Sequence, residues 1–357
     1  MAPRTIAGFV AAVIALSLPA TTPVRAERAM KVLLLYDMEG ITGADEFRKT
    51  TVSHPAEYAE GRKSLTADVN AAIAGLKAGG ATEIMVVDGH GSGNSQEPDV
   101  LEAQLLPPAA MHYRSTPFDI YMDSYDHSID AIVAIGMHAG AGNRTGFLAH
   151  TYTSFDIEYR VNGVPFNESM ILAMGAARLK IPVIMVSGDD QLEREIRKAM
   201  PWAKYGVVKH AVNVGKAEPL ARDAASRNIE TAAREGVQAL AQAKVFEMPG
   251  PYRFALKFED AAQAQNAALL PGAEILTDAQ TVQVRANDFE EGYRLSLRLI
   301  SLAGVVRGAA GSNMAIGKLP NAQEIRTGIT DWSYDRWING VPVTQPGPAP
   351  TRYWGAR

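Results

Sequence analysis

Two carboxylates stand at the end of a short apolar stretch near the start of the chain. Residues 33–35 are three leucines, which predict a buried strand, and Asp37 and Glu39 follow them directly. Residues i and i+2 of a strand point to the same side, so the two side chains can converge on one point. Two carboxylates so close repel one another unless a proton or a cation lies between them. A strand end followed by an Asx-type turn would carry the same residues, so the pair alone does not establish a metal site.

Two histidines follow two other predicted strands. Residues 83–87 and 131–136 are apolar runs, and His90 and His138 come shortly after them. In α/β proteins, sites form beyond the carboxyl ends of the parallel strands, so these residues should gather at one edge of the sheet. The chain has no cysteine, so any metal must be held by His, Asp or Glu. A single histidine in a Gly-rich loop is usually a turn or surface residue, but three strand ends with metal-type ligands predict a metal site.

Two further residues are candidates with ordinary alternatives. Glu168 follows Asn167, a predicted helix cap, and could be the acidic residue that commonly complements a helix N-terminus. His150 could equally be a histidine of the core. The remaining histidines have no partner at a diagnostic spacing, and we expect none of them in a site: His54, His112, His127 and His210.

Two aspartates have expected supporting roles. Asp88 lies two residues before His90, where it could orient that histidine, although a turn-forming aspartate fits as well. Asp190 is predicted to cap the helix that follows it.

Apolar strands and helices alternate along the chain from about residue 30. Strands are predicted around 33–35, at 83–87, 131–136, 182–186, 253–258 and 281–285, with a hairpin at 159–166 that contains Asn162-Gly163. Helices are predicted at 58–76, 167–179, 191–200 and 218–243, and after Asp288. The alternation predicts an α/β fold with a central, mostly parallel sheet flanked by helices, a smaller C-terminal α+β part and an extended tail.

The first residues of the chain have the features of a secretory signal. Arg4 precedes an apolar core at residues 6–18, and the small-x-small triplet at 24–26 resembles a cleavage site. We therefore expect a signal peptide at 1–26 and export to a bacterial-type periplasm or beyond. The formal charge of −4 gives no reason to expect nucleic acid or an anionic membrane as a partner, and no membrane association is expected after cleavage.

The mature chain divides into two expected parts. Residues 27–302 carry the strand–helix alternation and all the candidate site residues, and residues 303–357 form a C-terminal extension rich in Trp and Pro. Prolines at 346, 348 and 350 predict extended chain there. The extension either wraps the domain or reaches a neighbouring subunit.

Five short motifs occur in the order found in DppA-type D-aminopeptidases, and the chain resembles this family over residues 30–302. The motifs are Asp37-Met38-Glu39-Gly40, Asp88-Gly89-His90, Gly136-Met137-His138-Ala139, Asn162-Gly163 with Asn167-Glu168, and Val186-Ser187-Gly188-Asp189-Asp190. Each motif is short, but the ordered set is specific. The resemblance implies a zinc-dependent aminopeptidase that acts on short peptides.

The resemblance also implies two zinc ions per subunit and assigns their ligands. Asp37 would bridge the two ions. Glu39 and His90 would complete one zinc site, and His138 and Glu168 would complete the other. These ligand types agree with the general preference of zinc for imidazole nitrogen and carboxylate oxygen.

His150 matches the family's catalytic histidine. Either a metal-activated water or His150 itself would attack the peptide carbonyl, and the sequence does not separate the roles of nucleophile and general acid or base. The resemblance further implies peptides with an N-terminal D-residue, such as D-Ala peptides from cell-wall turnover, and a ring-like homo-oligomer such as a decamer.

Two other functions fit the same residues. One is a metal amidohydrolase that acts on L-peptides or on a different small amide. The other is a non-catalytic periplasmic protein whose metal only holds a ligand, which would need no His150 and would be expected to have two similar lobes.

Overall fold

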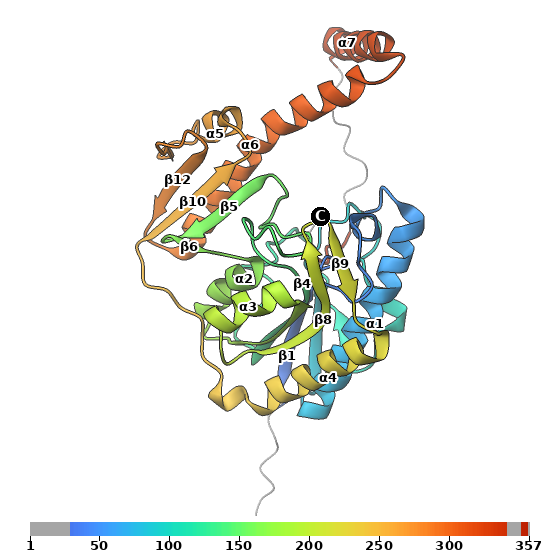
Figure 1. Cartoon of the computed structure of the whole chain (residues 1–357), viewed down its shortest axis with the longest axis vertical. Coiled ribbons are helices and arrows are strands. Elements are labelled where there is room, and N and C mark those ends of the chain that lie inside the picture. The colour runs from blue at the N-terminus through green and yellow to red at the C-terminus, as the bar shows by residue number, and fades with distance from the viewer. Residues whose placement is uncertain (1–28, 341–350, 356–357) are drawn as a thin grey trace, which may run out of the picture.

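Seven strands form the main sheet of the protein. The computed structural model describes residues 29–340 and 351–355 and orders the strands β3-β2-β1-β4-β7-β8-β9 (Figure 1). All neighbours are parallel except the last pair, β8 and β9. The strands span Ala109–Met111 (β3), Glu83–Asp88 (β2), Lys31–Tyr36 (β1), Ala131–Met137 (β4), Val183–Asp189 (β7), Lys204–Asn213 (β8) and Lys216–Pro219 (β9).

Strand β1 lies in the middle of the sheet and is covered on both faces. Val32, Leu34 and Tyr36 pack into one hydrophobic cluster, whereas Leu33 and Leu35 pack into another. Successive side chains of a strand point to opposite faces, so a continuous apolar run requires two covering layers. This is why the leucine run belongs to a central strand.

Helices cover the two faces of the main sheet. Helices α1 (Pro55–Gly79) and α4 (Arg222–Gln238) pack side by side over the face that carries Val32 and Leu34. Helices α2 (Glu168–Ala177) and α3 (Asp190–Ala199) contribute to the cluster on the opposite face. Gly80, in the left-handed conformation that glycine adopts readily, ends α1.

A second, antiparallel sheet joins the cluster on the α2 side. Its order is β11-β12-β10-β5-β6, with spans Glu274–Ile275, Thr281–Ala286, Tyr252–Phe258, Asp156–Val161 and Val164–Pro165. Helices α5 (Ala261–Ala267) and α6 (Phe289–Gly317) pack with it. Strands β5 and β6 form the predicted hairpin, so this smaller part draws strands from the middle of the chain as well as from its end.

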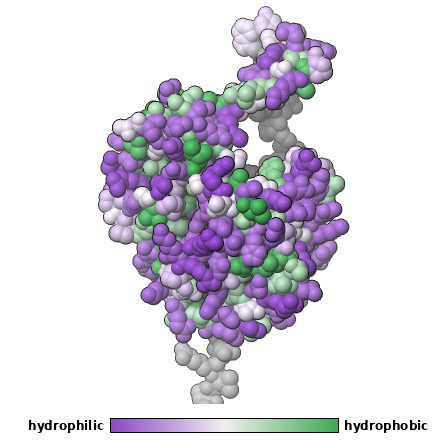
Figure 2. Space-filling view, viewed as in Figure 1, coloured by the Kyte–Doolittle hydropathy of each residue, from purple (hydrophilic) through white to green (hydrophobic). Residues whose placement is uncertain are grey.

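Helix α6 extends beyond the second sheet and leads to α7 (Ala322–Asn339), which lies away from both sheets and projects from the surface (Figure 1, Figure 2). By length and composition α6 could cross a membrane, but Tyr293 and Leu299 in its first half are fully buried in the domain core. That half is therefore a core helix. Short 3₁₀ turns complete the described elements at Phe47–Thr50, Glu102–Gln104 and Leu240–Gln242.

The predicted α/β class with a mostly parallel sheet is confirmed, and several details are corrected. The helix predicted at 218–243 is shorter, because strand β9 occupies Lys216–Pro219 and α4 ends at Gln238. Strand β8 was not predicted. Helix α6 includes residue 302, and Trp332 and Trp337 lie on α7. The division of the chain at 302 stays a prediction. The signal peptide at 1–26 and the prolines at 346–350 lie outside the described residues.

The ends of β1 and β4 approach one another too closely for a side chain. The amide of Gly40 donates to the carbonyl oxygen of Gly136 at 2.7 Å. A Cβ atom on Gly40 would lie 1.9 Å from the carbonyl oxygen of Met137. Gly136 has a φ of +72°, which favours glycine. These two glycines let the segment after β1 press against the segment after β4.

Replacing Gly40 with alanine should therefore strain two backbone segments at once. We expect Gly40→Ala to lower the free energy of unfolding by about 3 kcal/mol, as overpacking against fixed backbone does. Urea unfolding measures the change. Gly91→Ala is the matched control, because a Cβ there meets nothing within 4 Å among the described residues. Equal stability of the two variants would contradict the close approach.

Candidate metal centre

Adjacent strand ends bring the predicted ligands together. Asp37 and Glu39 follow β1, His90 follows β2 and His138 follows β4, and these three strands are neighbours in the sheet. Glu168 is the first residue of α2, whose N-cap is Asn167, as predicted. The parallel register thus places ligands from distant parts of the sequence at one edge.

The distances define one continuous cluster. His138 Nε2 lies 3.3 Å from Asp37 Oδ2 and 3.7 Å from Glu168 Oε2. His90 Nε2 lies 3.2 Å from Glu39 Oε1. All five of these side chains are at least nine-tenths buried. The structure therefore brings the five predicted metal ligands together at one buried place.

Two overlapping groups within the cluster have the spacing of metal ligands. One contains Asp37, Glu39 and His138, and the other contains His138, His150 and Glu168. In each group the candidate ligand atoms all lie within 4.8 Å of one another. Both groups include His138, so they overlap in one candidate metal-binding region.

The three histidines present the same nitrogen to the cluster. The Nδ1–H of His138 donates to the next residue's carbonyl oxygen at 3.0 Å. The Nδ1–H of His150 donates to the carbonyl oxygen two residues earlier at 2.7 Å, and that of His90 donates to Asp99 Oδ2 at 2.8 Å. Because each acceptor oxygen fixes a proton on Nδ1, Nε2 is the nitrogen that each ring would offer to a cation after any proton on it is displaced.

Two buried ligand atoms support a cation at this place. His138 Nε2 and Glu39 Oε2 have no hydrogen-bond partner among the described residues, although both are buried. Buried polar atoms without partners are costly and rare in native structures. A divalent cation bound by imidazole and carboxylate would satisfy both atoms. The residues present therefore fit zinc, which takes these ligand types.

Burial and mutual charge oppose one another in the cluster. Burial and the Glu39 carboxylate raise the pKa of Asp37. Burial alone would lower the pKa of His138, but the carboxylates of Glu168 and Asp37 outweigh it and raise this pKa to about 10. Burial also opposes ionisation of Glu39, yet the charge of His90 lowers its pKa. The buried carboxylates are thus stabilised only by positive charge close to them, and a divalent cation would provide it.

His150 lies beside the cluster on a strained loop. Its ring stacks on that of His138, with 4.1 Å between centroids and 11° between planes. Leu148 and Tyr152, two residues to either side, have φ values of +47° and +69°. Non-glycine residues in this region concentrate at functional sites. Burial and the charge of His138 lower the pKa of His150, so its imidazole is neutral at neutral pH.

The second expected role of an aspartate is corrected. Asp189, and not Asp190, caps α3, because its Oδ1 accepts from the amides of Gln191 and Leu192. The other oxygen of Asp189 accepts from the amide of Phe147, three residues before His150. Asp189 therefore fixes the loop that carries His150.

Asp99 supports His90, a role for which the sequence suggested Asp88. Both Asp88 oxygens accept backbone amides, those of His90 and Asp99. Asp99 accepts from the His90 ring through one oxygen and from Ser92 through the other at 2.6 Å, with Tyr58 as a further donor to that oxygen. Asp88 thus shapes the loop and Asp99 orients the imidazole. Nothing in the local pattern around Asp99 indicated this.

Tyr121 is a second residue that the sequence did not indicate. Its hydroxyl donates to Glu168 Oε2 at 2.5 Å, and the amide of Tyr152 donates to Glu168 Oε1 at 2.6 Å. Burial and the charge of Glu168 raise the pKa of Tyr121, so the hydroxyl keeps its proton. These two donors fix the Glu168 carboxylate beside His138.

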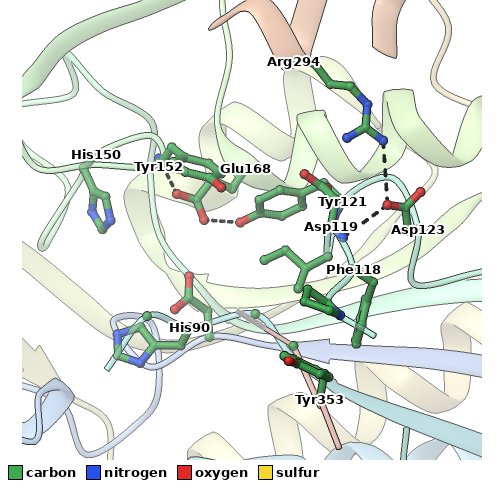
Figure 3. Close-up of a pocket in the computed structure, with 16 residues that line it drawn as sticks. His90, Phe118, Asp119, Tyr121, Asp123, His150, Tyr152, Glu168, Arg294 and Tyr353 are labelled. Atoms are coloured by element: carbon green, nitrogen blue, oxygen red, sulfur yellow. Dashed lines mark hydrogen bonds and ion pairs between the residues drawn. The ribbon is translucent and has the colours of Figure 1, made fainter. Parts of the chain in front are cut away.

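The cluster opens into a cavity of about 760 Å³. His90, His150 and Glu168 reach one side of it, and Phe118, Asp123 and Arg294 line the far side (Figure 3). Asp37 also lines the cavity, whereas Glu39 and His138 lie behind it. A buried set of metal ligands at the carboxyl edge of a parallel sheet, open to a cavity of this size, defines the class of metal-dependent hydrolases.

Comparison with known proteins identifies the family. The Peptidase_M55 family, described as D-aminopeptidase, matches residues 30–297, so the chain belongs to this family. The D-aminopeptidase of Bacillus subtilis (strain 168) is 29% identical over 276 residues, covering 77% of this chain and 98% of that protein. The solved structure of the Zn-dependent D-aminopeptidase DppA from Bacillus subtilis, a self-compartmentalizing protease, matches with a TM-score of 0.70 and 27% identity over the same shares. The resemblance inferred from the motifs is confirmed.

The Asp99 contact leads to a prediction about metal affinity. Carboxylates that orient a metal-binding histidine typically contribute about 10- to 100-fold to affinity, so Asp99→Ala should weaken zinc binding by about that factor. Competition with a chromogenic chelator measures it. Asp126→Ala is the control, because Asp126 is an exposed carboxylate before β4, at the opposite edge of the sheet. Unchanged affinity in Asp99→Ala would show that His90 needs no such support.

A buried lysine lies under the loop that carries Glu39. Lys209, on β8, is fully buried and donates to the carbonyl oxygens of Glu39 at 2.6 Å and Ala44 at 2.5 Å. Its Nζ lies 4.6 Å from the centre of the Phe147 ring. Burial lowers the pKa of Lys209 from 10.5 to about 7, against the opposing charge of Asp189. A neutral amine still has two N–H groups for the two carbonyl oxygens.

The lowered pKa predicts how stability depends on pH. Between about 7 and 10.5 the unfolded chain binds a proton on Lys209 that the folded chain does not, so stability rises with pH in this window. Lys209 should contribute a slope of about 1.4 kcal/mol per pH unit there. Urea unfolding at several pH values should show this slope lost in Lys209→Met and kept in Lys216→Met, an exposed control on β9. Equal slopes in both variants would contradict the prediction.

Proposed function

We propose that this chain is an exported, di-zinc aminopeptidase that releases the N-terminal residue of short peptides, with D-Ala peptides as its substrates. The observation that carries the proposal is the buried cluster of imidazoles and carboxylates, two of whose ligand atoms have no partner among the described residues. Membership in the D-aminopeptidase family supports aminopeptidase activity, and the zinc-dependent relative supports zinc as the metal.

The donor set suits two zinc ions. Glu39 and His90 would hold one ion, His138 and Glu168 the other, and Asp37 would bridge them. The short distances from His90 to Glu39, and from His138 to both Asp37 and Glu168, support this division. Two bound zinc ions polarise a carbonyl and lower the pKa of water.

His150 is the residue we assign to proton transfer or nucleophilic attack. Its Nδ1–H is held by a carbonyl oxygen, so its Nε2 lone pair is free to accept a proton or to attack a carbonyl carbon. The lowered pKa keeps it neutral at the pH where a base is needed. After accepting a proton it would pass that proton to the leaving amine.

The short-peptide substrate is supported by the cavity. A volume of about 760 Å³ is within the range of sites for small molecules. The D-preference rests on the activity named for the family and for the Bacillus subtilis relative. Export rests on the pattern of residues 1–26. A homo-oligomer, ring-like and up to a decamer, is proposed because the relative of known structure is a self-compartmentalizing protease.

A metal amidohydrolase acting on L-peptides or another amide is the main alternative, and substrate stereochemistry separates it. A periplasmic binding protein with a structural metal is less well supported. It would be expected to have two similar lobes, whereas the described residues contain a parallel sheet and an unlike, antiparallel sheet.

The deciding experiment is amino-acid release from D-Ala-D-Ala and L-Ala-L-Ala by the zinc-loaded mature chain. We expect release from the D-dipeptide only, and loss of release after chelation. Release from the L-dipeptide only would keep the metal hydrolase and overturn the D-preference. Two bound zinc ions without release from either would indicate a different amide, and no bound zinc would overturn the proposal.

The role of His150 is tested by His150→Ala in the same assay. General acid–base catalysis contributes about 10²- to 10⁴-fold, so kcat/KM should fall by that amount with zinc content unchanged. His127→Ala, at an exposed histidine before β4, is the matched control and should keep full activity. Loss of a zinc ion from His150→Ala would instead make His150 a metal ligand.

A further inference from the structure

The end of the chain returns to the cavity. The family match stops at residue 297, so the segment 351–355 lies outside the part shared with the family. Yet Tyr353 and Gly355 line the same cavity as His90 and His150 (Figure 3). A segment outside the region matched by the family therefore forms part of the wall around the site.

Backbone hydrogen bonds hold this segment in place. The amide of Asp88 donates to the carbonyl oxygen of Trp354 at 3.2 Å. Arg114 and Tyr353 exchange two backbone hydrogen bonds, both of 2.8 Å. Asp88 is the last residue of β2, and Arg114 lies just past β3. The segment thus lies between the end of β2 and the residues just past β3, where the two strands no longer pair. Its bond to Asp88 places it at the start of the loop that carries His90.

Side chains on both sides of Tyr353 anchor it. Trp354 is 3% exposed and packs edge-on against Tyr113, with 6.4 Å between ring centroids. The Arg352 guanidinium lies 4.3 Å from the centre of the same Tyr113 ring. At Gly355 a Cβ atom would lie 1.8 Å from the carbonyl oxygen of Asp88, so this close approach requires glycine. These contacts depend on the side chains of Arg352 and Trp354 and on the glycine at 355, so they are specific to the sequence of this segment.

The anchored segment closes one side of the cavity. Figure 3 shows Tyr353 next to Phe118, on the side away from His150 and Glu168. Gly89, His90 and Gly91 form the neighbouring wall. Removing the segment would take Tyr353 and Gly355 out of the cavity lining, whereas Phe118 and the loop of His90 would remain.

We propose that residues 352–355 set the substrate length of this enzyme by closing the cavity on the side of His90 and Phe118. The inference rests on the proposed peptidase function and adds a specificity-determining element to it. A peptide that extends past this wall would clash with Tyr353, whereas a dipeptide fits within the cavity. Exclusion by a clash selects substrates without any change to the metal ligands.

The test compares peptide length profiles. Values of kcat/KM are measured for D-Ala di-, tri- and tetrapeptides, or for the L-series if only that series is cleaved. One variant ends at Gly340 and lacks the segment. A second, Tyr353→Ala, keeps the Trp354 anchor and removes only the side chain in the cavity, so it stays informative if truncation disturbs folding. Tyr334→Ala, at a tyrosine that is 61% exposed on α7, is the matched control.

We expect the tetrapeptide-to-dipeptide ratio of kcat/KM to rise at least about tenfold in the truncated chain and in Tyr353→Ala, the scale on which a pocket discriminates by size. The ratio should stay constant in Tyr334→Ala. Ratios within about twofold of the wild type in both tail variants would overturn the proposal. An equal rise in Tyr334→Ala would overturn it too.

Amide hydrogen exchange tests where residues 352–355 lie and does not depend on catalytic activity. The amides of Asp88 and Arg114 donate to Trp354 and Tyr353, so they should exchange faster in the truncated chain than in the full chain. Equal exchange would show that the segment does not occupy this place and would overturn the proposal. Absence of hydrolysis by the wild-type chain itself would instead overturn the proposed function, whatever the exchange shows.

Discussion

One electrostatic constraint governs the structure around this site: the carboxylates buried at the edge of the main sheet must have positive charge beside them. Asp37, Glu39 and Glu168 are nearly inaccessible to water, and a buried carboxylate is tolerated only when it is paired, protonated or bound to a cation. The close contact of Gly40 with β4 sets Asp37 beside His138, and the buried Lys209 holds the backbone of Glu39. Backbone packing and a hidden amine thus fix groups that would otherwise repel one another.

The sequence predicted the five residues of the buried cluster because each one follows a strand or begins a helix. Asp37, His90 and His138 are placed by the order of parallel strands, and a strand is visible as an apolar run. The groups that orient these ligands could not be found in this way. Asp99 and Tyr121 lie in irregular segments whose paths depend on tertiary contacts, and their own spacing carries no periodic signal.

The same reasoning explains the errors in the fold. Strand β8 ends in polar residues and is exposed at its outer end, so it has no long apolar run to reveal it. The predicted helix at 218–243 included the last two residues of β9, because a short edge strand before a helix has little sequence pattern of its own. Asp190 was predicted as the cap, but the backbone path after β7 gives this role to Asp189, one residue earlier. Local pattern determined the types of the main elements, and tertiary context determined their ends.

The site therefore has two parts: a buried cluster held by the core strands, and a cavity wall to which Tyr353 and Gly355 contribute. The ligands and their supports come from the ends of core strands and from α2, where any displacement would disturb packing on both sides of the sheet. The wall of Tyr353 and Gly355 comes from the end of the chain and is joined to the domain by a few backbone hydrogen bonds and one buried tryptophan. A change in the wall alters which peptides enter and leaves the charge balance of the centre intact. Terminal extensions can thus change specificity at low cost to the fold, because they add contacts at the rim of a centre that is already stable.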